Sequence, residues 1–179
     1  MSAKTLVRRV LAPFGAGAPR VGDWAPRVQA RAHDGSTIDL RDFRGRYLVL
    51  YFYPKAFTHG CTIETKQFRD HYAEFTALGA SVVGVSPDRR QLQCDFAQLH
   101  QLPFALIADE DGAVCSAFGA TRSLVPLTKR LTFVIDPQGR VAARFHHELN
   151  VGRHVEQVLA FLKAQRTSAA RVDAVHAER

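Results

Sequence analysis

The chain has 179 residues, of which 46% are hydrophobic and 23% are charged, so it contains enough apolar material for one packed core. The longest apolar run, from Tyr47 to Tyr53, falls far short of the roughly 20 residues that a membrane-spanning helix needs, which excludes such a helix. Three cysteines are too few for a disulfide scaffold and favour a reducing, cytoplasmic setting.

The formal net charge of +7 is concentrated at the two ends of the chain. Residues 1–20 carry four basic side chains and no acidic one, and residues 165–179 contribute +1, which leaves +2 for the rest. A nearly balanced body argues against a broad phosphate-binding face, so we expect no nucleic-acid and no membrane partner. A binder that uses the basic N-terminal arm stays open as an alternative.

The N-terminal arm contains residues that break regular structure. Arg8 and Arg9 precede a short apolar stretch, as in a signal sequence, but Pro13 and Gly15 cut this stretch below the about 7 to 15 residues that export uses. We therefore expect a folded domain from about Arg20. The predicted division is a mobile basic extension at 1–19, one domain at 20–164 and a tail at 165–179.

Apolar patterning and turn residues predict the strands. Asp34-Gly35 suits the turn of an N-terminal hairpin, because glycine tolerates positive φ. The segment Leu48 to Tyr53 is apolar at every position, as expected for a central strand covered on both faces. Strands are expected at 28–32, 37–40, 48–53, 81–85, 105–108, 131–135 and 141–145.

Helical spacing predicts the helices between these strands. Phe68, Tyr72 and Phe75 recur at the spacing of one helix face, which indicates a helix from Cys61 to Leu78. A short helix is expected at 113–118, and an amphipathic helix is expected at 151–164. This order of elements predicts an α/β fold with a mixed central sheet flanked by helices.

A further helix follows the second of the three central strands. Ser86 offers an N-cap hydroxyl and Pro87 suits the first helical position. Leu92, Phe96 and Leu99 form the expected buried stripe.

Cys61 follows the central strand at the expected start of a helix, where open α/β sheets place their sites. Unpaired backbone N–H groups and the helix dipole favour a thiolate there, and the thiolate is the nucleophilic form of cysteine. A buried structural cysteine is the alternative interpretation of the same position.

The residues around Cys61 resemble the peroxiredoxins. Pro54, Thr58 and Cys61 form the pattern P-x-x-x-T-x-x-C, and the chain from about 20 to 164 is similar to the bacterioferritin comigratory protein or Q-type branch. The other matching segments are Thr62, Glu64, Phe68-Arg69-Asp70, Val21-Gly22-Asp23, Ala25-Pro26, Ser86-Pro87-Asp88, Leu102-Pro103-Phe104, Asp109, Gly112, Phe118-Gly119 and Arg130-x-Thr132-Phe133-x-Ile135-Asp136.

The resemblance implies a thioredoxin-like fold and a peroxidase that reduces hydrogen peroxide and organic hydroperoxides through a sulfenic acid. It implies that Cys61 is the peroxidatic cysteine, that Thr58 offers a hydroxyl to the peroxide, and that Pro54 shields the thiolate. Arg130 matches the distant active-site arginine. Donors placed at the leaving oxygen stabilise the charge that develops when the O–O bond breaks. The resemblance implies no cofactor and no metal.

The chain departs from the family pattern at two positions. His59 replaces the usual proline two residues before Cys61, where it either assists thiolate formation or is an exposed loop histidine. Lys66 occupies the place of the typical resolving cysteine, so the usual disulfide within one helix is impossible. Resolution then falls to an outside thiol such as thioredoxin, to Cys94 or to Cys115. Of the two cysteines, Cys94 is preferred, because its helix should turn it toward solvent, and the one-cysteine enzyme stays open.

Other functions remain as alternatives. A redox sensor would use the same Cys61 without turnover, although Thr58 and Arg130 favour turnover. We expect a monomer or a homodimer, and the sequence does not reveal the preferred peroxide.

Overall fold

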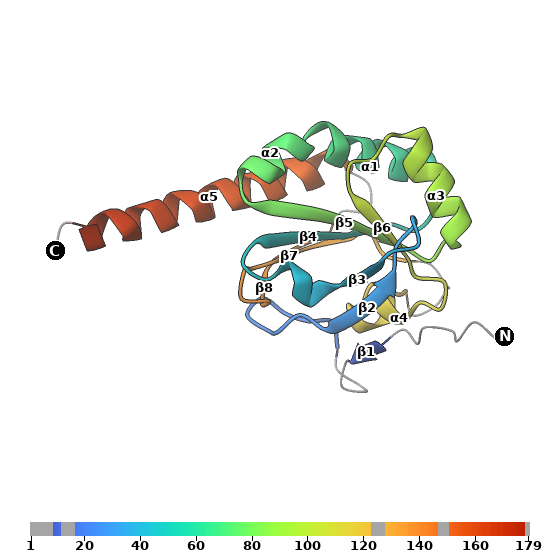
Figure 1. Cartoon of the computed structure of the whole chain (residues 1–179), viewed down its shortest axis with the longest axis horizontal. Coiled ribbons are helices and arrows are strands. Elements are labelled where there is room, and N and C mark those ends of the chain that lie inside the picture. The colour runs from blue at the N-terminus through green and yellow to red at the C-terminus, as the bar shows by residue number, and fades with distance from the viewer. Residues whose placement is uncertain (1–8, 12–16, 123–127, 147–150, 178–179) are drawn as a thin grey trace.

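The computed structural model describes residues 9–11, 17–122, 128–146 and 151–177 (Figure 1). The strands are β1 (Arg9–Leu11), β2 (Arg27–Arg31), β3 (Thr37–Asp39), β4 (Tyr47–Phe52), β5 (Ala80–Ser86), β6 (Ala105–Ala108), β7 (Leu131–Ile135) and β8 (Val141–His146). The helices are the short 3-10 helix η1 (Leu40–Phe43), then α1 (His59–Asp70), α2 (Tyr72–Ala77), α3 (Arg90–Leu99), α4 (Ala113–Ala117) and α5 (Val151–Ala177). The expected α/β class and the mixed sheet are confirmed.

The central sheet has the order β6-β5-β4-β7-β8. Strand β4 pairs in parallel with β5 and antiparallel with β7, so it is covered by neighbours on both edges. Its residues alternate between the two faces of the sheet, and Leu48, Leu50 and Phe52 belong to one apolar cluster while Val49 and Tyr51 belong to the other. Two buried faces explain why the β4 sequence is apolar throughout.

Helices α1, α2, α3 and α5 cover one face of the sheet, and the N-terminal strands with α4 lie on the other (Figure 1). Phe68, Phe75, Phe96 and Val158 pack on the helical side, and Val114 and Phe118 pack on the opposite side. The end of β4 therefore delivers the chain directly into the helical layer.

The predicted N-terminal hairpin is present as β2 and β3, with Ala30 opposite Ile38. Strand β1 pairs with β2 as well, so the hairpin belongs to a three-stranded sheet. Strand β1 lies within the range 1–19 that was assigned to the extension. The boundary of the folded domain at about Arg20 stays a prediction.

The single helix expected from Cys61 to Leu78 is divided into α1 and α2. His71, between them, has φ −96° and ψ 8°, outside helical geometry, and its carbonyl accepts the N–H groups of Glu74 and Phe75. The apolar spacing survives the break, since Phe68 and Phe75 are both fully buried. Hydrophobic periodicity reports the buried face of the segment rather than the continuity of its backbone.

The predicted start of α3 is wrong. Ser86 is the last residue of β5, and α3 begins at Arg90, after an N-cap residue, Arg89, whose side chain makes no capping hydrogen bond. The hydroxyl of Ser86 instead donates to Oδ2 of Asp88 at 2.6 Å. Local capping chemistry was therefore satisfied within the turn between β5 and α3, which left the helix to begin four residues after Ser86.

The buried stripe of α3 also differs from the expectation. Leu99 is 67% exposed, and the fully covered residues are Gln93, Phe96 and Ala97. Gln93 is drawn inward because its Oε1 accepts a hydrogen bond from the buried hydroxyl of Tyr53. Cys94, about 100° further round the helix, is half-buried at the edge of this face rather than turned fully to solvent.

Helix α5 does not end near Ala164 as expected but continues to Ala177. None of the described helices combines the length and the apolar character needed to cross a bilayer. In Figure 1 the last turns of α5 project beyond the body, while its first half packs on the helical layer.

Candidate active site

The loop between β4 and α1 is held by a turn from elsewhere in the chain. The backbone N–H of Ala56 donates to Oδ2 of Asp88 at 2.6 Å, and the same oxygen accepts the hydroxyl of Ser86. Asp88 therefore joins the turn after β5 to the loop after β4. This anchor lies where two parallel strands end side by side, which brings their following loops together.

The loop itself has a constrained backbone. Phe57 has a φ of 62°, in the left-handed region that residues with a Cβ rarely adopt. Its ring packs edge-on against Phe96 of α3, with the ring centroids 5.1 Å apart. Strained conformations of this kind persist only where surrounding contacts hold them, and they cluster at functional sites.

Thr58 occupies the N-cap position of α1 without capping it through its side chain. Its Oγ1 donates to the carbonyl of Lys55 at 2.9 Å, and its own carbonyl accepts the N–H of Thr62. Because the hydroxyl proton is used toward Lys55, the lone pairs of Oγ1 are left to accept a hydrogen bond from another group. Thr58 is exposed and Pro54, earlier in the loop, is half-buried.

Cys61 is the third residue of α1 and its side chain is fully buried. Nη2 of Arg130 lies 3.5 Å from its Sγ, although the two residues are 69 positions apart in the chain. The sulfur thus sits at the positive end of a helix dipole and beside a guanidinium, and both favour negative charge on it.

Arg130 is held by Glu64, one helical turn beyond Cys61. Nη1 of Arg130 donates to Oε2 of Glu64, and both side chains are buried. Burial opposes the positive charge, but the neighbouring Glu64 and Cys61 raise the pKa of the Arg130 guanidinium above its ordinary value. The arginine therefore remains a fixed cation with one amino group on the carboxylate and the other at the sulfur.

His154 of α5 completes this buried group. Its Nδ1 lies 2.8 Å from Oε1 of Glu64 and 3.5 Å from the hydroxyl of Thr132. His154, Glu64 and Thr132 are all fully buried. Side chains from α1, β7 and α5 consequently meet behind the sulfur of Cys61.

Two buried tyrosines form an apolar floor below this site. Tyr51 stacks on Phe68 with centroids 4.4 Å apart, and its hydroxyl lies 3.2 Å from Oγ1 of Thr65. Burial raises the pKa of Tyr51 and of Tyr53 well above the ordinary value, so both phenols stay protonated. They contribute packing and no negative charge.

The structure brings together Cys61 and Arg130, with Pro54 and Thr58 in the loop that leads to Cys61. His59 is the first residue of α1 and its side chain is exposed. Cys94 lies on α3 on the same side of the sheet, whereas Cys115 belongs to the apolar cluster on the other side. None of these three cysteines forms a disulfide.

Sequence reasoning missed the supporting residues Asp88, Glu64 and His154 as parts of the site. Glu64 had a local signal, because it follows Cys61 by three residues and shares its helix face. His154 had only a position within an amphipathic stripe. Among the described residues, no group of three His, Cys, Asp or Glu side chains is arranged to hold a metal ion.

Known proteins resemble this chain in sequence and in fold. The model of the AhpC/TSA family matches residues 21–144. Peroxiredoxin Bcp of Bacillus subtilis is 37% identical over 149 residues, which cover 80% of this chain and 94% of that protein. The chain is a peroxiredoxin of the AhpC/TSA family. Peroxiredoxin Bcp of Escherichia coli is 35% identical over 150 residues, with 80% and 96% covered.

Solved structures agree with this assignment. The peroxidoxin BcpB of Mycobacterium tuberculosis superposes with a TM-score of 0.77 at 35% identity and covers 82% of this chain and 97% of its own. The bacterioferritin comigratory protein of Xanthomonas campestris, whose structures were used to study alkyl peroxide reduction, gives a TM-score of 0.73 at 34% identity, covering 76% and 90%. The thioredoxin-like fold is confirmed, and this peroxiredoxin is a thiol-dependent peroxidase that consumes a peroxide and a thiol reductant.

Proposed function

We propose that Cys61 is the peroxidatic cysteine of this peroxiredoxin. Its thiolate attacks one oxygen of a peroxide ROOH, so that an S–O bond forms while the O–O bond breaks. The sulfur is oxidised by two electrons to a sulfenic acid, and the leaving oxygen takes a proton and departs as ROH. The observation that carries the proposal is the placement of Nη2 of Arg130 at 3.5 Å from the buried Sγ, in the first turn of α1.

Thr58 and Arg130 have complementary roles in this proposal. The hydroxyl of Thr58, whose proton is used toward Lys55, accepts a hydrogen bond from the O–H of the bound hydroperoxide and so orients the hydroperoxide. The guanidinium of Arg130 stabilises the charge on the thiolate and on the departing oxygen. Pro54 limits the access of water to the sulfur. These roles favour turnover over a sensor that uses Cys61 alone, because a sensor has no need to stabilise a leaving oxygen.

The test is mass spectrometry of the intact protein after one equivalent of hydrogen peroxide, with and without a sulfenic-acid trap. We expect a trapped adduct on Cys61 and on no other cysteine. Oxidation that begins at Cys94 or Cys115 would overturn the assignment. The same experiment with tert-butyl hydroperoxide measures whether organic peroxides are substrates as well.

Cys94 is the proposed resolving cysteine. Helix α3 contacts the loop between β4 and α1, because Phe96 packs against Phe57. Cys94 belongs to α3 and is therefore on the helix next to this loop. A disulfide requires Cα atoms within about 7 Å, so the first turn of α1 must unwind for the two sulfurs to meet. Phe57 is strained and Thr58 is exposed, and both stand directly before this turn. The start of α1 is therefore the part of the site whose opening requires the least free energy. The alternative is a one-cysteine enzyme that an outside thiol reduces.

The reductant, the location, the oligomeric state and the domain bounds of this peroxiredoxin are proposals as well. We infer that thioredoxin is the reductant, that the enzyme acts in the cytoplasm as a monomer or homodimer, and that it binds neither nucleic acid nor membrane. We also infer that residues 20–164 form the catalytic domain, with 1–19 as an extension and 165–179 as a tail. The charge distribution supports the absence of nucleic-acid and membrane partners, and the cysteine content supports the cytoplasmic setting.

A further inference from the structure

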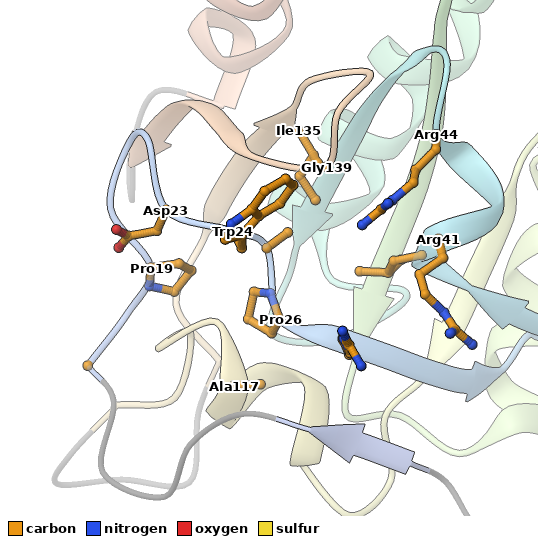
Figure 2. A pocket seen from close by; sticks show the side chains of 13 residues that line it. Pro19, Asp23, Trp24, Pro26, Arg41, Arg44, Ala117, Ile135 and Gly139 are labelled. Atoms are coloured by element: carbon orange, nitrogen blue, oxygen red, sulfur yellow. The ribbon is translucent and has the colours of Figure 1, made fainter.

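A cavity of about 990 Å³ lies near the beginning of β4, the strand whose other end precedes Cys61. Figure 2 shows side chains that line this cavity. Leu40 and Arg44, in its wall, come just before β4, whereas Cys61 comes after β4. Ile135, also in the wall, pairs with Leu48 at the beginning of β4. The length of β4, six residues at about 3.3 Å each, separates the cavity from the peroxidatic site.

Apolar side chains form most of the cavity wall. Trp24, Pro26, Leu40 and Ile135 contribute carbon surface from three separate segments of the chain. The indole of Trp24 is 54% exposed, which is high for the largest apolar side chain of the protein. A partly exposed aromatic ring in a concave surface is the usual form of a small-molecule site.

Positive charge is concentrated at the same cavity. Arg27, Arg41 and Arg44 all line it. Arg41 is paired with Asp39 at 2.6 Å, but among the described residues neither Arg27 nor Arg44 makes an ion pair.

Aromatic contacts bring two guanidiniums over Trp24. The guanidinium carbon of Arg140 lies 4.0 Å from the ring centroid, and that of Arg44 lies 5.9 Å from it. Figure 2 shows Arg44 extending across the cavity toward Trp24, while the carboxylate of Asp23 points away from it. Such contacts hold the guanidinium of Arg44 in place but leave its N–H donors available to a ligand.

We propose that this cavity binds a small organic anion with an apolar body. The carboxylate of such a ligand satisfies the donors of Arg27 and Arg44, and its carbon skeleton covers Trp24 and Leu40. A neutral apolar ligand would leave both guanidiniums without a counter-charge, and an inorganic anion would leave the indole exposed. The volume lies within the range of about 300 to 1,000 Å³ of small-molecule sites.

The single tryptophan makes this proposal directly measurable. Trp24 is the only Trp in the chain, so intrinsic tryptophan fluorescence reports on this cavity alone. The full-length protein is titrated with octanoate, below its micelle concentration, with 1-octanol as the neutral probe of equal length and acetate as the probe without an apolar body. We expect a saturable change with octanoate and at least tenfold weaker binding of 1-octanol and of acetate.

Variants assign the charge to individual residues. Arg44→Ala and Arg27→Ala should each weaken octanoate binding at least tenfold, since a hydrogen bond to a charged group is lost. Arg31→Ala is the matched control, because Arg31 is an exposed arginine on the same strand as Arg27 and does not line the cavity. All three variants should consume peroxide at the wild-type rate, which shows that they are folded.

Three results would overturn the proposal. They are the absence of a saturable fluorescence change with octanoate, binding of 1-octanol as tight as that of octanoate, and wild-type octanoate binding in Arg27→Ala and Arg44→Ala. The outcome does not depend on the role of Cys61, because the fluorescence signal arises at Trp24, near the other end of β4.

Discussion

Glu64 links His154 to Arg130 through its two carboxylate oxygens. Oε1 lies 2.8 Å from Nδ1 of His154, and Oε2 accepts from Nη1 of Arg130. The other amino group of Arg130 lies 3.5 Å from the sulfur of Cys61. His154 of the C-terminal helix is thereby connected to the sulfur of Cys61 through three successive buried contacts, so the position of Arg130 depends on α5 as well as on α1.

His154→Leu should slow the oxidation of Cys61 by peroxide by roughly tenfold, because a carboxylate that loses a hydrogen-bond partner no longer fixes the arginine. The loss of a buried partner should also lower the free energy of unfolding by about 1–3 kcal/mol. His154→Asn, whose amide N–H can take the place of Nδ1–H, should restore most of the rate. Stopped-flow oxidation measures the rate, and chemical denaturation measures the stability.

Alkylation of Cys61 by iodoacetamide distinguishes an effect of His154 on the position of Arg130 from an effect on folding. That reaction needs the thiolate but develops no charge on a leaving oxygen, so His154→Leu should affect it less than the peroxide reaction. Equal losses in both reactions, or no rescue by His154→Asn, would show that His154 contributes only to packing.

Arg130→Ala should reduce the rate of sulfenic acid formation by about 10²-fold, by analogy with the loss of other positioned donors. Arg130→Lys should recover only part of it, because one ammonium group cannot contact the carboxylate of Glu64 and the sulfur in the same fixed geometry. Arg144→Ala, on β8, is the control for a change of net charge alone. A wild-type rate in Arg130→Ala would contradict the assigned role.

Cys61→Ser should abolish peroxide consumption and leave the fold intact, because the hydroxyl of serine does not ionise near neutral pH. Thr58→Val, which keeps the shape of the side chain but removes the acceptor, should slow the reaction by about 10²-fold. Peroxide consumption is followed directly, and circular dichroism checks the fold. Cys115→Ala, on the other side of the sheet, should retain activity.

Cys94→Ser should prevent formation of a Cys61–Cys94 disulfide after oxidation and should slow turnover with thioredoxin. Peptide mapping under non-reducing conditions detects the disulfide in the wild type, and steady-state assays measure the turnover. The first oxidation step should be unchanged, because Cys94 does not contact the sulfur of Cys61 in the reduced enzyme. Normal turnover of Cys94→Ser, with no crosslink in the wild type, would establish a one-cysteine mechanism.

Stability should decrease as the pH falls through the ordinary titration range of histidine, in part because of His33. Burial lowers the pKa of His33, and its Nδ1 accepts the backbone N–H of Leu106 at 3.1 Å, which requires the neutral ring. The unfolded chain then binds a proton at a higher pH than the folded one, so stability is lost from about pH 6.5 downward until His33 also titrates in the folded state.

His33→Asn, whose carbonyl oxygen can accept the same N–H, isolates this contribution. Its unfolding free energy should vary less with pH between about 6.5 and 5 than that of the wild type. Denaturant unfolding at several pH values measures the difference. Identical pH profiles would show that His33 contributes nothing to the dependence.

Much of this peroxiredoxin was determined by short-range patterns in its sequence. The apolar run of β4 required two covered faces, and the alternation around Asp34-Gly35 required a hairpin, so the class of the fold followed from periodicity. The placement of Cys61 after a central strand also followed from sequence, since the end of such a strand and the start of a helix form a site by geometry alone.

Tertiary contacts decided what periodicity could not. The bond from Tyr53 drew Gln93 inward, and α3 consequently buried Phe96 and Ala97 while it left Leu99 exposed. Local rules rank residues by their own polarity, but a polar side chain becomes a core residue when a distant buried donor requires an acceptor.

The active site shows the same division. Cys61, Thr58 and Pro54 lie within eight residues, and a local pattern sufficed to find them. The contacts of Glu64 with Arg130 and His154 span 66 and 90 residues of chain, so only the packing of α1, β7 and α5 brings these groups together. Charge placed in a dry interior must be matched by partners from whichever elements are adjacent in space, and that adjacency exists only in the folded molecule.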